Sequence, residues 1–151
     1  MKDRTEKVAV VSGGASGIGL GIAEALAHVG AHVVVGDIRA DEAAQAADAL
    51  TKHGVRSLAC TCDVTDRDSV MELADRAWGA FEHVDIIVNN AGVTCAGGPL
   101  IEGSEADLRW LLEVNLIGEW HGCSVFGKRF VEQGTPAHIL NTASENSFYV
   151  G

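Results

Sequence analysis

Basic side chains are scarce in this sequence, which has 11 Lys and Arg residues against 21 Asp and Glu residues and a formal net charge of −10 at pH 7. A nucleic-acid groove or a face that binds an anionic membrane needs clustered Lys and Arg, so this balance argues against both partners. Long apolar runs are also missing, because none approaches the roughly 18 residues that a membrane-spanning helix needs. The apolar run after the charged N-terminus is too short for a secretory signal peptide.

Paired metal-ligand spacing is absent as well. The four cysteines, Cys60, Cys62, Cys95 and Cys123, form no Cys-x-x-Cys pair and the six histidines are scattered, so we predict no metal site. Cys60 and Cys62 point to the same face of a predicted strand, which is poor geometry for a disulfide. We therefore expect free, reduced thiols in a cytoplasmic protein. A reactive thiol at Cys95 or Cys123 is the alternative, although no basic neighbour supports it.

The overall composition is that of a globular protein. Hydrophobic residues make up 47% and charged residues 21% of the 151 positions, a balance that differs from that of disordered chains. A chain of this size buries about two-thirds of its unfolded surface, which is enough for one core. We therefore expect a single domain over residues 1–151.

Short apolar runs alternate with amphipathic segments along the chain. Strands are predicted at residues 7–12, 32–36, 55–62, 84–88 and 138–142. Helices are predicted at residues 17–29, 41–53, 65–81 and 104–133. Buried strands that alternate with helices form a parallel sheet covered on both faces, with right-handed crossovers. The expected fold class is therefore α/β, a Rossmann-like doubly wound parallel sheet with five strands present.

Helical spacing of apolar residues also predicts which helix faces are buried. The predicted face of the first helix is Ile18, Ile22, Ala25, Leu26 and Val29. The predicted faces of the next two are Ala43, Ala46, Ala47 and Leu50, and then Val70, Leu73, Ala74, Ala77 and Phe81. Thr65 with Asp68 predicts a capping box at the start of the third helix. The fourth helix is predicted to start with Ser104 and Asp107 and to be irregular near Gly118.

Glycines gather between the first predicted strand and the first predicted helix, in the run Ser12-Gly13-Gly14-Ala15-Ser16-Gly17-Ile18-Gly19. A glycine at the turn lets the chain reverse, and Gly17 at the helix start lets the backbone approach a pyrophosphate without a Cβ in the way. The helix N-terminus adds unpaired N–H groups and partial positive charge. The spacing is not Gly-x-Gly-x-x-Gly, but its place between strand and helix predicts the phosphate site of a dinucleotide. The alternative is a flexible turn with incidental glycines.

Asp37 follows the second predicted strand, 18 positions after Gly19. An acid at this place accepts hydrogen bonds from the hydroxyls of the adenosine ribose. Its charge repels the 2′-phosphate of NADP, so we predict NAD as the cofactor, with NADP the less favoured alternative. Arg39 could offset part of that repulsion, although a solvated arginine at a helix start is the simpler interpretation.

With these residues identified, the chain resembles the classical short-chain dehydrogenases/reductases. Five motifs of that family occur here in the family's order. They are the glycine loop at 12–19, Cys62-Asp63-Val64-Thr65, Asn89-Asn90-Ala91-Gly92, Val114-Asn115-Leu116 and Asn141-Thr142-Ala143-Ser144. In the first motif, Ser12 stands where the family more often has Thr.

The resemblance implies a role for each motif. It implies cofactor binding by Gly13, Ser16, Gly17, Ile18, Gly19, Asp37, Asp63, Val64, Asn90, Ala91 and Gly92. Asp63 would bond the adenine amino group, and Val64 would lie beside the adenine ring. Ser144 would be the catalytic serine, and Asn115 would hold a helix kink and a water of the catalytic relay.

Each of these side chains also has a simpler interpretation. Asp63 could cap the following helix, and Asn89 and Asn90 could tie a turn through side-chain bonds. Asn115 could bond back to its own helix or face solvent. Ser144 could be an ordinary hydroxyl at the end of a strand.

The resemblance covers only the N-terminal part of a usual family member. The family transfers hydride between a nicotinamide cofactor and an alcohol or carbonyl carbon, and a Tyr-xxx-Lys pair manages the hydroxyl proton. That pair is expected after Ser144 and beyond Gly151, because Tyr149, the single tyrosine, lies too close to Gly151 to belong to it. We therefore expect the C-terminal strands and helices of the domain to be missing, and the chain alone to be inactive.

The expected substrate is a small secondary alcohol or ketone. Residues 104–133 resemble a helix that pairs subunits in the family, which implies a homo-oligomer with Trp110 and Trp120 as interface candidates and core packing as their alternative. Three functions stay open at this point. The chain could be part of an NAD-dependent oxidoreductase, a non-catalytic nucleotide-binding module, or a regulatory subunit whose sheet is completed by a partner chain.

Overall fold

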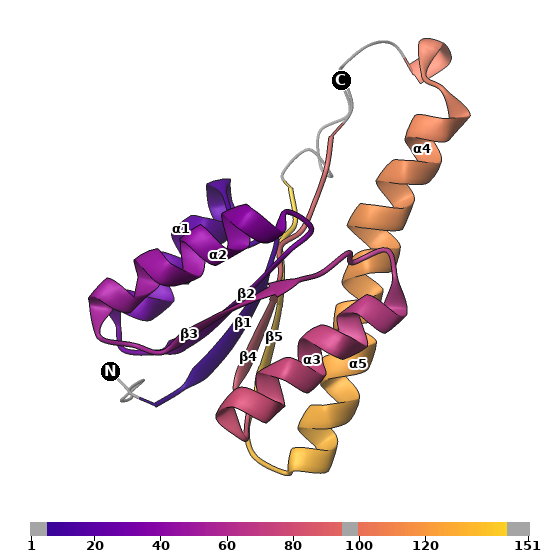
Figure 1. Ribbon diagram of the computed structural model, residues 1–151. Coiled ribbons are helices and arrows are strands. Elements are labelled where there is room, and N and C mark those ends of the chain that lie inside the picture. The colour runs from indigo at the N-terminus through magenta and orange to yellow at the C-terminus, as the bar shows by residue number, and fades with distance from the viewer. Residues whose placement is uncertain (1–5, 95–99, 145–151) are drawn as a thin grey trace.

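The computed structural model describes residues 6–94 and 100–144, and over these ranges the chain forms a parallel sheet with helices on both faces (Figure 1). The strands are β1 (Val8–Ser12), β2 (His32–Asp37), β3 (Ser57–Thr61), β4 (Ile86–Asn89) and β5 (His138–Asn141). Their order in the sheet is β3-β2-β1-β4-β5, and every neighbouring pair is parallel. The expected Rossmann-like doubly wound α/β sheet is confirmed, with strand ends that shift by one or two residues.

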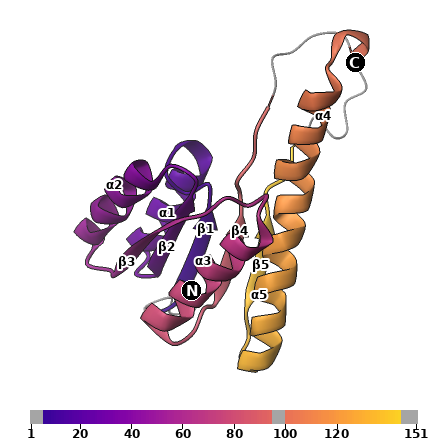
Figure 2. The same ribbon diagram turned by 45° about the vertical axis from the view of Figure 1, so that its right-hand side comes forward.

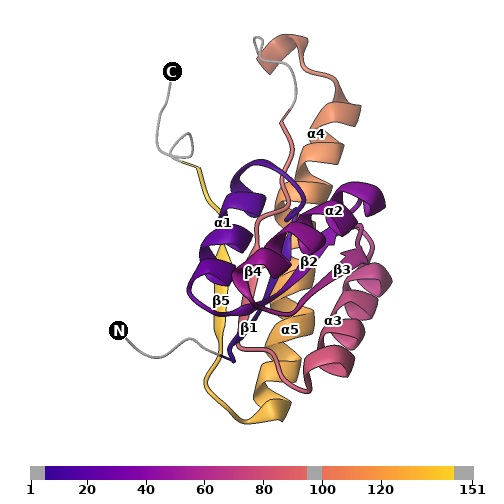
Figure 3. The ribbon, with the colours of Figure 1, turned by 60° about the vertical axis from the view of Figure 1, so that its left-hand side comes forward.

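The helices lie in two layers around this sheet. They are α1 (Gly17–His28), α2 (Ala40–Leu50), α3 (Arg67–Phe81), α4 (Glu105–Leu112) and α5 (Glu119–Gln133), with 3-10 turns η1 (Thr51–His53) and η2 (Leu100–Glu102) and the π-helical segment η3 (Glu113–Gly118). Figures 2 and 3 show α1 and α2 on one face of the sheet and α3 and α5 on the other. Within the described ranges, no helix is both long and apolar enough to cross a membrane.

The core consists of one apolar layer on each face of the sheet. Strand residues packed toward α1 and α2 include Val11, Val33, Val35 and Val88. Those packed toward α3 and α5 include Val8, Val10, Val34 and Ile87. Successive strand residues point to opposite faces, so a strand covered on both sides must be apolar throughout. This requirement explains the short, unbroken valine-rich runs of β1 and β2.

The buried face of α1 differs from the predicted one, whereas the predicted faces of α2 and α3 are confirmed. Gly19, Ala23 and Ala27 are the buried residues of α1. The predicted set is half-buried or exposed: Ile18, Ile22, Ala25, Leu26 and Val29. A Cβ on Gly19 would lie 2.1 Å from the carbonyl oxygen of Gly13, so the helix start and the loop before it lie in direct backbone contact. Close packing therefore selects the small residues at the centre of the buried face of α1, while Ile22 and Leu26 of the predicted set pack half-buried against the same core.

The start of α3 is also different from the prediction. Asp66 is the N-cap residue, and its carboxylate accepts a hydrogen bond from the backbone N–H of Asp68 at 2.9 Å. The predicted capping box of Thr65 with Asp68 is therefore wrong. Thr65 instead donates its backbone N–H and its hydroxyl to the Asp63 carboxylate, at 2.9 and 2.7 Å. The reason is that Asp66, one residue closer to the helix, supplies the acceptor for the first-turn N–H, while the Thr65 hydroxyl is bound to Asp63.

The long segment 104–133 starts and breaks as predicted. The Ser104 hydroxyl accepts the backbone N–H of Asp107 at 3.0 Å at the start of α4. The expected irregularity near Gly118 is the π-helical segment η3, which separates α4 from α5. A Cβ on Gly118 would lie 2.7 Å from a methyl group of Val64, so the end of η3 packs directly on the loop after β3. Segments with π-helical geometry often occur at functional sites.

Candidate cofactor site

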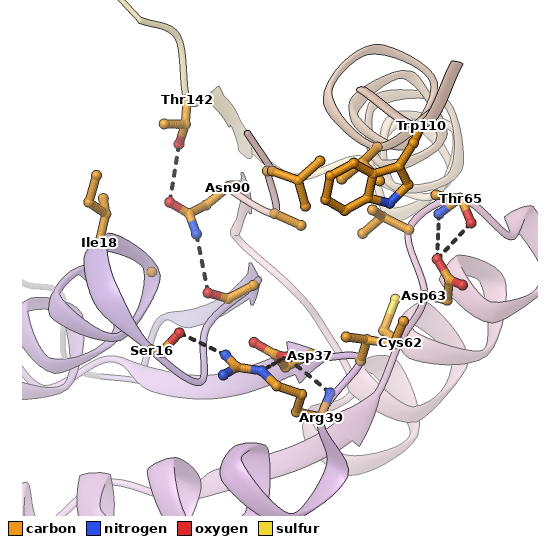
Figure 4. Close-up of a pocket in the computed structure, with 18 residues that line it drawn as sticks. Ser16, Ile18, Asp37, Arg39, Cys62, Asp63, Thr65, Asn90, Trp110 and Thr142 are labelled. Carbon is orange, nitrogen blue, oxygen red and sulfur yellow. Dashed lines mark hydrogen bonds and ion pairs between the residues drawn. The ribbon is translucent and has the colours of Figure 1, made fainter. Parts of the chain in front are cut away.

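A cavity of about 770 Å³ lies at the carboxyl-terminal edge of the sheet, where the segments after β1, β2, β3 and β4 converge (Figure 4). Trp110 of α4, Val114 of η3 and Thr142 after β5 complete its lining. The chain builds the sheet outward from β1 to β3 and then crosses to β4 and β5 on the other side of β1. Open α/β sheets bind ligands at such a switch point, beyond the carboxyl ends of the strands.

The structure brings ten of the eleven predicted cofactor residues to this cavity. They are Gly13, Ser16, Ile18, Gly19, Asp37, Asp63, Val64, Asn90, Ala91 and Gly92. The eleventh, Gly17, lies between two of them as the first residue of α1. The described lining also includes residues that the prediction did not name as cofactor residues: Ile38, Arg39, Cys62, Thr65, Val93, Trp110, Val114 and Thr142. The predicted catalytic residues Asn115 and Ser144 are not among the described lining residues.

Ser12 and Asn90 tie the glycine loop to the loop after β4. The Ser12 hydroxyl accepts the backbone N–H groups of Asn90 and Ala91 at 3.0 and 3.2 Å. The Asn90 side-chain amide also donates to the carbonyl oxygens of Ser12 and Gly13, at 3.1 and 3.2 Å. A Cβ on Gly13 would lie 2.8 Å from the Cα of Ala91. Asn90 therefore joins two loops rather than tying its own turn. No sequence pattern indicated that the Ser12 hydroxyl would also bind the loop after β4.

Gly17 has a different requirement from Gly13 and Gly19. Its φ is +55°, and a Cβ placed on it would meet no atom within 4 Å. The space beside the start of α1 is therefore open, and only the backbone conformation favours glycine there. Ser16 is the N-cap residue, yet its side chain makes no capping hydrogen bond to the helix. The start of α1 therefore has no side-chain cap, and its residues Ile18 and Gly19 line the cavity, as an anion site at a helix N-terminus requires.

Asp37 is a buried carboxylate at the end of β2, only 5% exposed. Its oxygens accept the backbone N–H groups of Ala15 and Arg39, each at 3.1 Å. The Arg39 side chain also reaches back, with Nε 3.3 Å from Asp37 and a terminal nitrogen 2.7 Å from the Ser16 hydroxyl (Figure 4). The interpretation of Arg39 as a merely solvated side chain is therefore wrong. Its guanidinium partly balances the Asp37 charge at the wall of the cavity.

The loop after β3 holds Asp63 and Val64 at the other end of the cavity. The Ser69 hydroxyl accepts the backbone N–H of Asp63 at 3.0 Å. The ring of His121 is buried in α5, and its Nδ1 lies 2.8 Å from the carbonyl oxygen of Val64, to which it donates. Asp63 forms a turn with Thr65 and does not cap α3, so the capping interpretation of Asp63 is wrong. No motif pointed to His121, because the loop that it holds lies 57 residues earlier.

Cys62 lines the cavity but is chemically inert at neutral pH. Burial raises the pKa of its thiol to about 12, so the nucleophilic thiolate is negligible. Cys60, Cys62 and Cys123 are free thiols in the structure. Cys95, the other residue considered as a reactive thiol, lies outside the described residues.

Asn115 clamps the loop after β4 from the π-helical segment. Its Oδ1 accepts the backbone N–H of Val93 at 2.8 Å, and its Nδ2 donates to the Val93 carbonyl oxygen at 2.9 Å. The alternative of a solvated or back-bonding side chain is therefore wrong. Asn115 therefore fixes a residue of the cavity wall without lining the cavity itself. Ser144, the other predicted catalytic residue, follows β5 as the last described residue.

These features define a nucleotide-binding α/β fold with its site at the switch point. Residues 7–151 match the family model described as short chain dehydrogenase. The chain belongs to this family.

Among curated proteins, the chain is 40% identical over 144 residues to 1-deoxy-11-beta-hydroxypentalenate dehydrogenase of Streptomyces avermitilis, covering 95% of this chain and 53% of the relative. It is 47% identical over 139 residues to cis-4-hydroxycyclohexanecarboxylate dehydrogenase of Sinomonas cyclohexanicum, covering 92% of this chain and 55% of the relative. The chain therefore spans about half the length of the curated relatives it matches.

Solved structures also align with this chain over about half of their own length. A short-chain dehydrogenase/reductase from Burkholderia phymatum in complex with NAD aligns at a TM-score of 0.90 with 40% identity, over 95% of this chain and 51% of that one. NAD⁺-bound xylitol dehydrogenase aligns at a TM-score of 0.93 with 28% identity, over 97% of this chain and 56% of that one.

Replacing Gly17 with alanine tests whether a phosphate binds in the open space at the start of α1. The positive φ makes Gly17→Ala cost about 1–2 kcal/mol of stability, and the new Cβ enters the space beside the helix N-terminus. We expect NAD to bind at least about tenfold more weakly, comparable to losing one hydrogen bond to a charged group. Isothermal titration with NAD measures the affinity, and urea unfolding measures the stability.

Gly54→Ala is the matched control, because Gly54 has a φ of +77° and equally open surroundings, yet lies at the opposite end of α2 from the cavity. It should lose similar stability and keep its NAD affinity. Equal NAD affinities of the two variants would remove the phosphate assignment of the glycine loop.

Proposed function

We propose that this chain is the cofactor-binding part of an NAD-dependent oxidoreductase, which transfers hydride between NAD and a secondary alcohol or ketone. The observation that carries the proposal is the buried Asp37 carboxylate, which lies on the same cavity as the uncapped start of α1. A hydroxyl donor and a phosphate anion could bind these two groups together, as an adenosine diphosphate moiety requires.

The groups that line the cavity fit the adenosine diphosphate part of NAD. The N–H groups at the start of α1 would hold the pyrophosphate, and Asp37 would accept hydrogen bonds from the adenosine ribose. Asp63 and Val64 would hold the adenine, and Asn90, Ala91 and Gly92, which line the same cavity, would lie on the adenosine side. Bound NAD supplies the hydride acceptor, and the protein supplies position and proton transfer.

For the reaction itself, we propose Ser144 as the residue that positions the substrate oxygen. Asn115 would serve the proton relay from the π-helical segment, where its side chain already fixes the Val93 backbone. Support for a secondary alcohol as the substrate comes from the relatives, which are named as dehydrogenases of a hydroxypentalenate and a hydroxycyclohexanecarboxylate.

We also propose that the protein forms a homo-oligomer through residues 104–133. Exposed apolar side chains gather along this segment, namely Leu108, Leu112, Leu116, Trp120 and Val131. An exposed stripe of this kind gains stability when a second copy covers it. Sedimentation equilibrium should give a dimer or larger species that Leu116→Glu dissociates, and a monomeric wild-type protein would contradict the proposal.

Cofactor choice should depend on the balance between Asp37 and Arg39. Asp37→Ala removes the acceptor for the ribose hydroxyls, so NAD should bind more weakly by about 1.5–3 kcal/mol. The 2′-phosphate of NADP is then no longer repelled, and NADP should gain relative to NAD. Arg39→Ala should act in the opposite sense, because Asp37 loses its counter-charge. Titration of each variant with both cofactors measures the two ratios, and a wild-type preference for NADP would contradict the role given to Asp37.

The 151-residue chain should bind NAD without measurable dehydrogenase activity. A positioned acid–base group contributes about 10²–10⁴ in rate, and no Tyr-xxx-Lys pair occurs in these residues. In a longer form that contains such a pair, Ser144→Ala should reduce turnover by a similar factor and leave NAD affinity nearly unchanged. NADH formation over a panel of cyclic and open-chain secondary alcohols measures this for both lengths. Robust turnover by the 151-residue chain would show that a residue present here supplies the acid–base group.

A further inference from the structure

The tryptophans of this chain have different surroundings. Trp78 packs against the rings of Phe126 and Phe130, at centroid distances of 5.7 and 5.8 Å. Trp120 lies under the guanidinium group of Arg67, 5.5 Å from its ring centre. Trp110 lines the cavity, is 47% exposed, and has no aromatic ring or guanidinium packed on it among the described residues. The large apolar surface of the Trp110 indole is therefore available to contact a ligand in the cavity.

Trp110 lies at one identifiable end of the cavity. Trp110 and Val114 are four residues apart and thus share one side of the continuous helical segment that α4 and η3 form. Val64, from the loop after β3, lines the same cavity. In Figure 4 the indole of Trp110 lies toward Asp63 and Thr65 and away from Ser16 and Ile18 at the start of α1. This end therefore combines a flat aromatic surface, two valines and a carboxylate.

These properties match one part of the proposed cofactor. A purine ring is flat and apolar on its faces and carries an amino donor at its edge, whereas ribose and pyrophosphate are polar throughout. Aromatic side chains stack on bases with substantial affinity. The Asp63 carboxylate would accept from the edge of a ring held between such walls.

We propose that Trp110 packs on the adenine of bound NAD and selects for the purine-containing part of the cofactor. This inference rests on the proposed function, and it makes Trp110 a specificity-determining residue of the cavity instead of an interface residue. ADP-ribose is the appropriate probe, because it contains the adenine, both phosphates and the adenosine ribose but no nicotinamide.

The affinity test compares alanine variants at two exposed tryptophans. Trp110→Ala should weaken ADP-ribose and NAD alike by about 5- to 100-fold, the range for losing one aromatic–base contact. Trp110→Phe keeps a ring and should stay within about threefold of the wild type. Trp120→Ala is the matched control, since Trp120 is 57% exposed but does not line the cavity, and it should bind both ligands as the wild type does.

Intrinsic fluorescence supplies a second measurement that does not depend on the alanine variant folding. ADP-ribose should quench part of the wild-type tryptophan emission. The ligand-induced quenching should disappear in Trp110→Phe and persist in Trp120→Phe.

The outcomes separate the two proposals. A wild-type protein that binds neither ADP-ribose nor NAD overturns the proposed function and this inference together. Wild-type binding with unchanged affinity in Trp110→Ala, or with quenching that persists in Trp110→Phe, overturns the role of Trp110 and leaves the proposed function standing.

Discussion

The close contact between the glycine loop and the loop after β4 is the constraint on which the site depends. A Cβ on Gly13 would collide with the Ala91 backbone, and a Cβ on Gly19 would collide with the Gly13 backbone and the Asn90 side chain. Four hydrogen bonds then join the two loops, and in each of them a donor of Asn90 or Ala91 meets an acceptor of Ser12 or Gly13. This contact fixes how α1 leaves the sheet, which in turn sets the direction of its unpaired N–H groups. The end of the cavity proposed to bind phosphate is thus a consequence of tight packing at the ends of β1 and β4.

Side chains from other elements hold the remaining loops of the cavity in place. Asn115 holds the Val93 backbone from the π-helical segment, and His121 holds the Val64 carbonyl from α5. Arg39 contacts both Asp37 and Ser16, so the Asp37 charge that we propose selects between cofactors is already partly balanced by this chain. Each loop at the carboxyl edge is therefore held by a side chain from another element. Such loops are pre-organised, so less ordering of the loops opposes ligand binding.

The sequence predicted the sheet and most of the cavity because both depend on local patterns. Unbroken valine runs mark strands buried on both faces, and acids or glycines at strand ends mark residues that line the cavity. The buried face of α1 was not predictable by hydrophobicity, since tight packing favours Gly19, Ala23 and Ala27 over the larger Ile18. Long-range partners were also missed. The Asn115 clamp, the His121 bond and the position of Trp110 on the cavity depend on which distant segments meet, and no local spacing encodes that.

Hydrogen–deuterium exchange of the 151-residue chain, with and without NAD, tests the central claim most directly. The account predicts that NAD slows amide exchange at the start of α1 and in the loops after β2, β3 and β4, while the opposite edge of the sheet exchanges as before. Protection that is absent, or that is centred away from these four segments, would contradict the assignment of the cavity as a dinucleotide site.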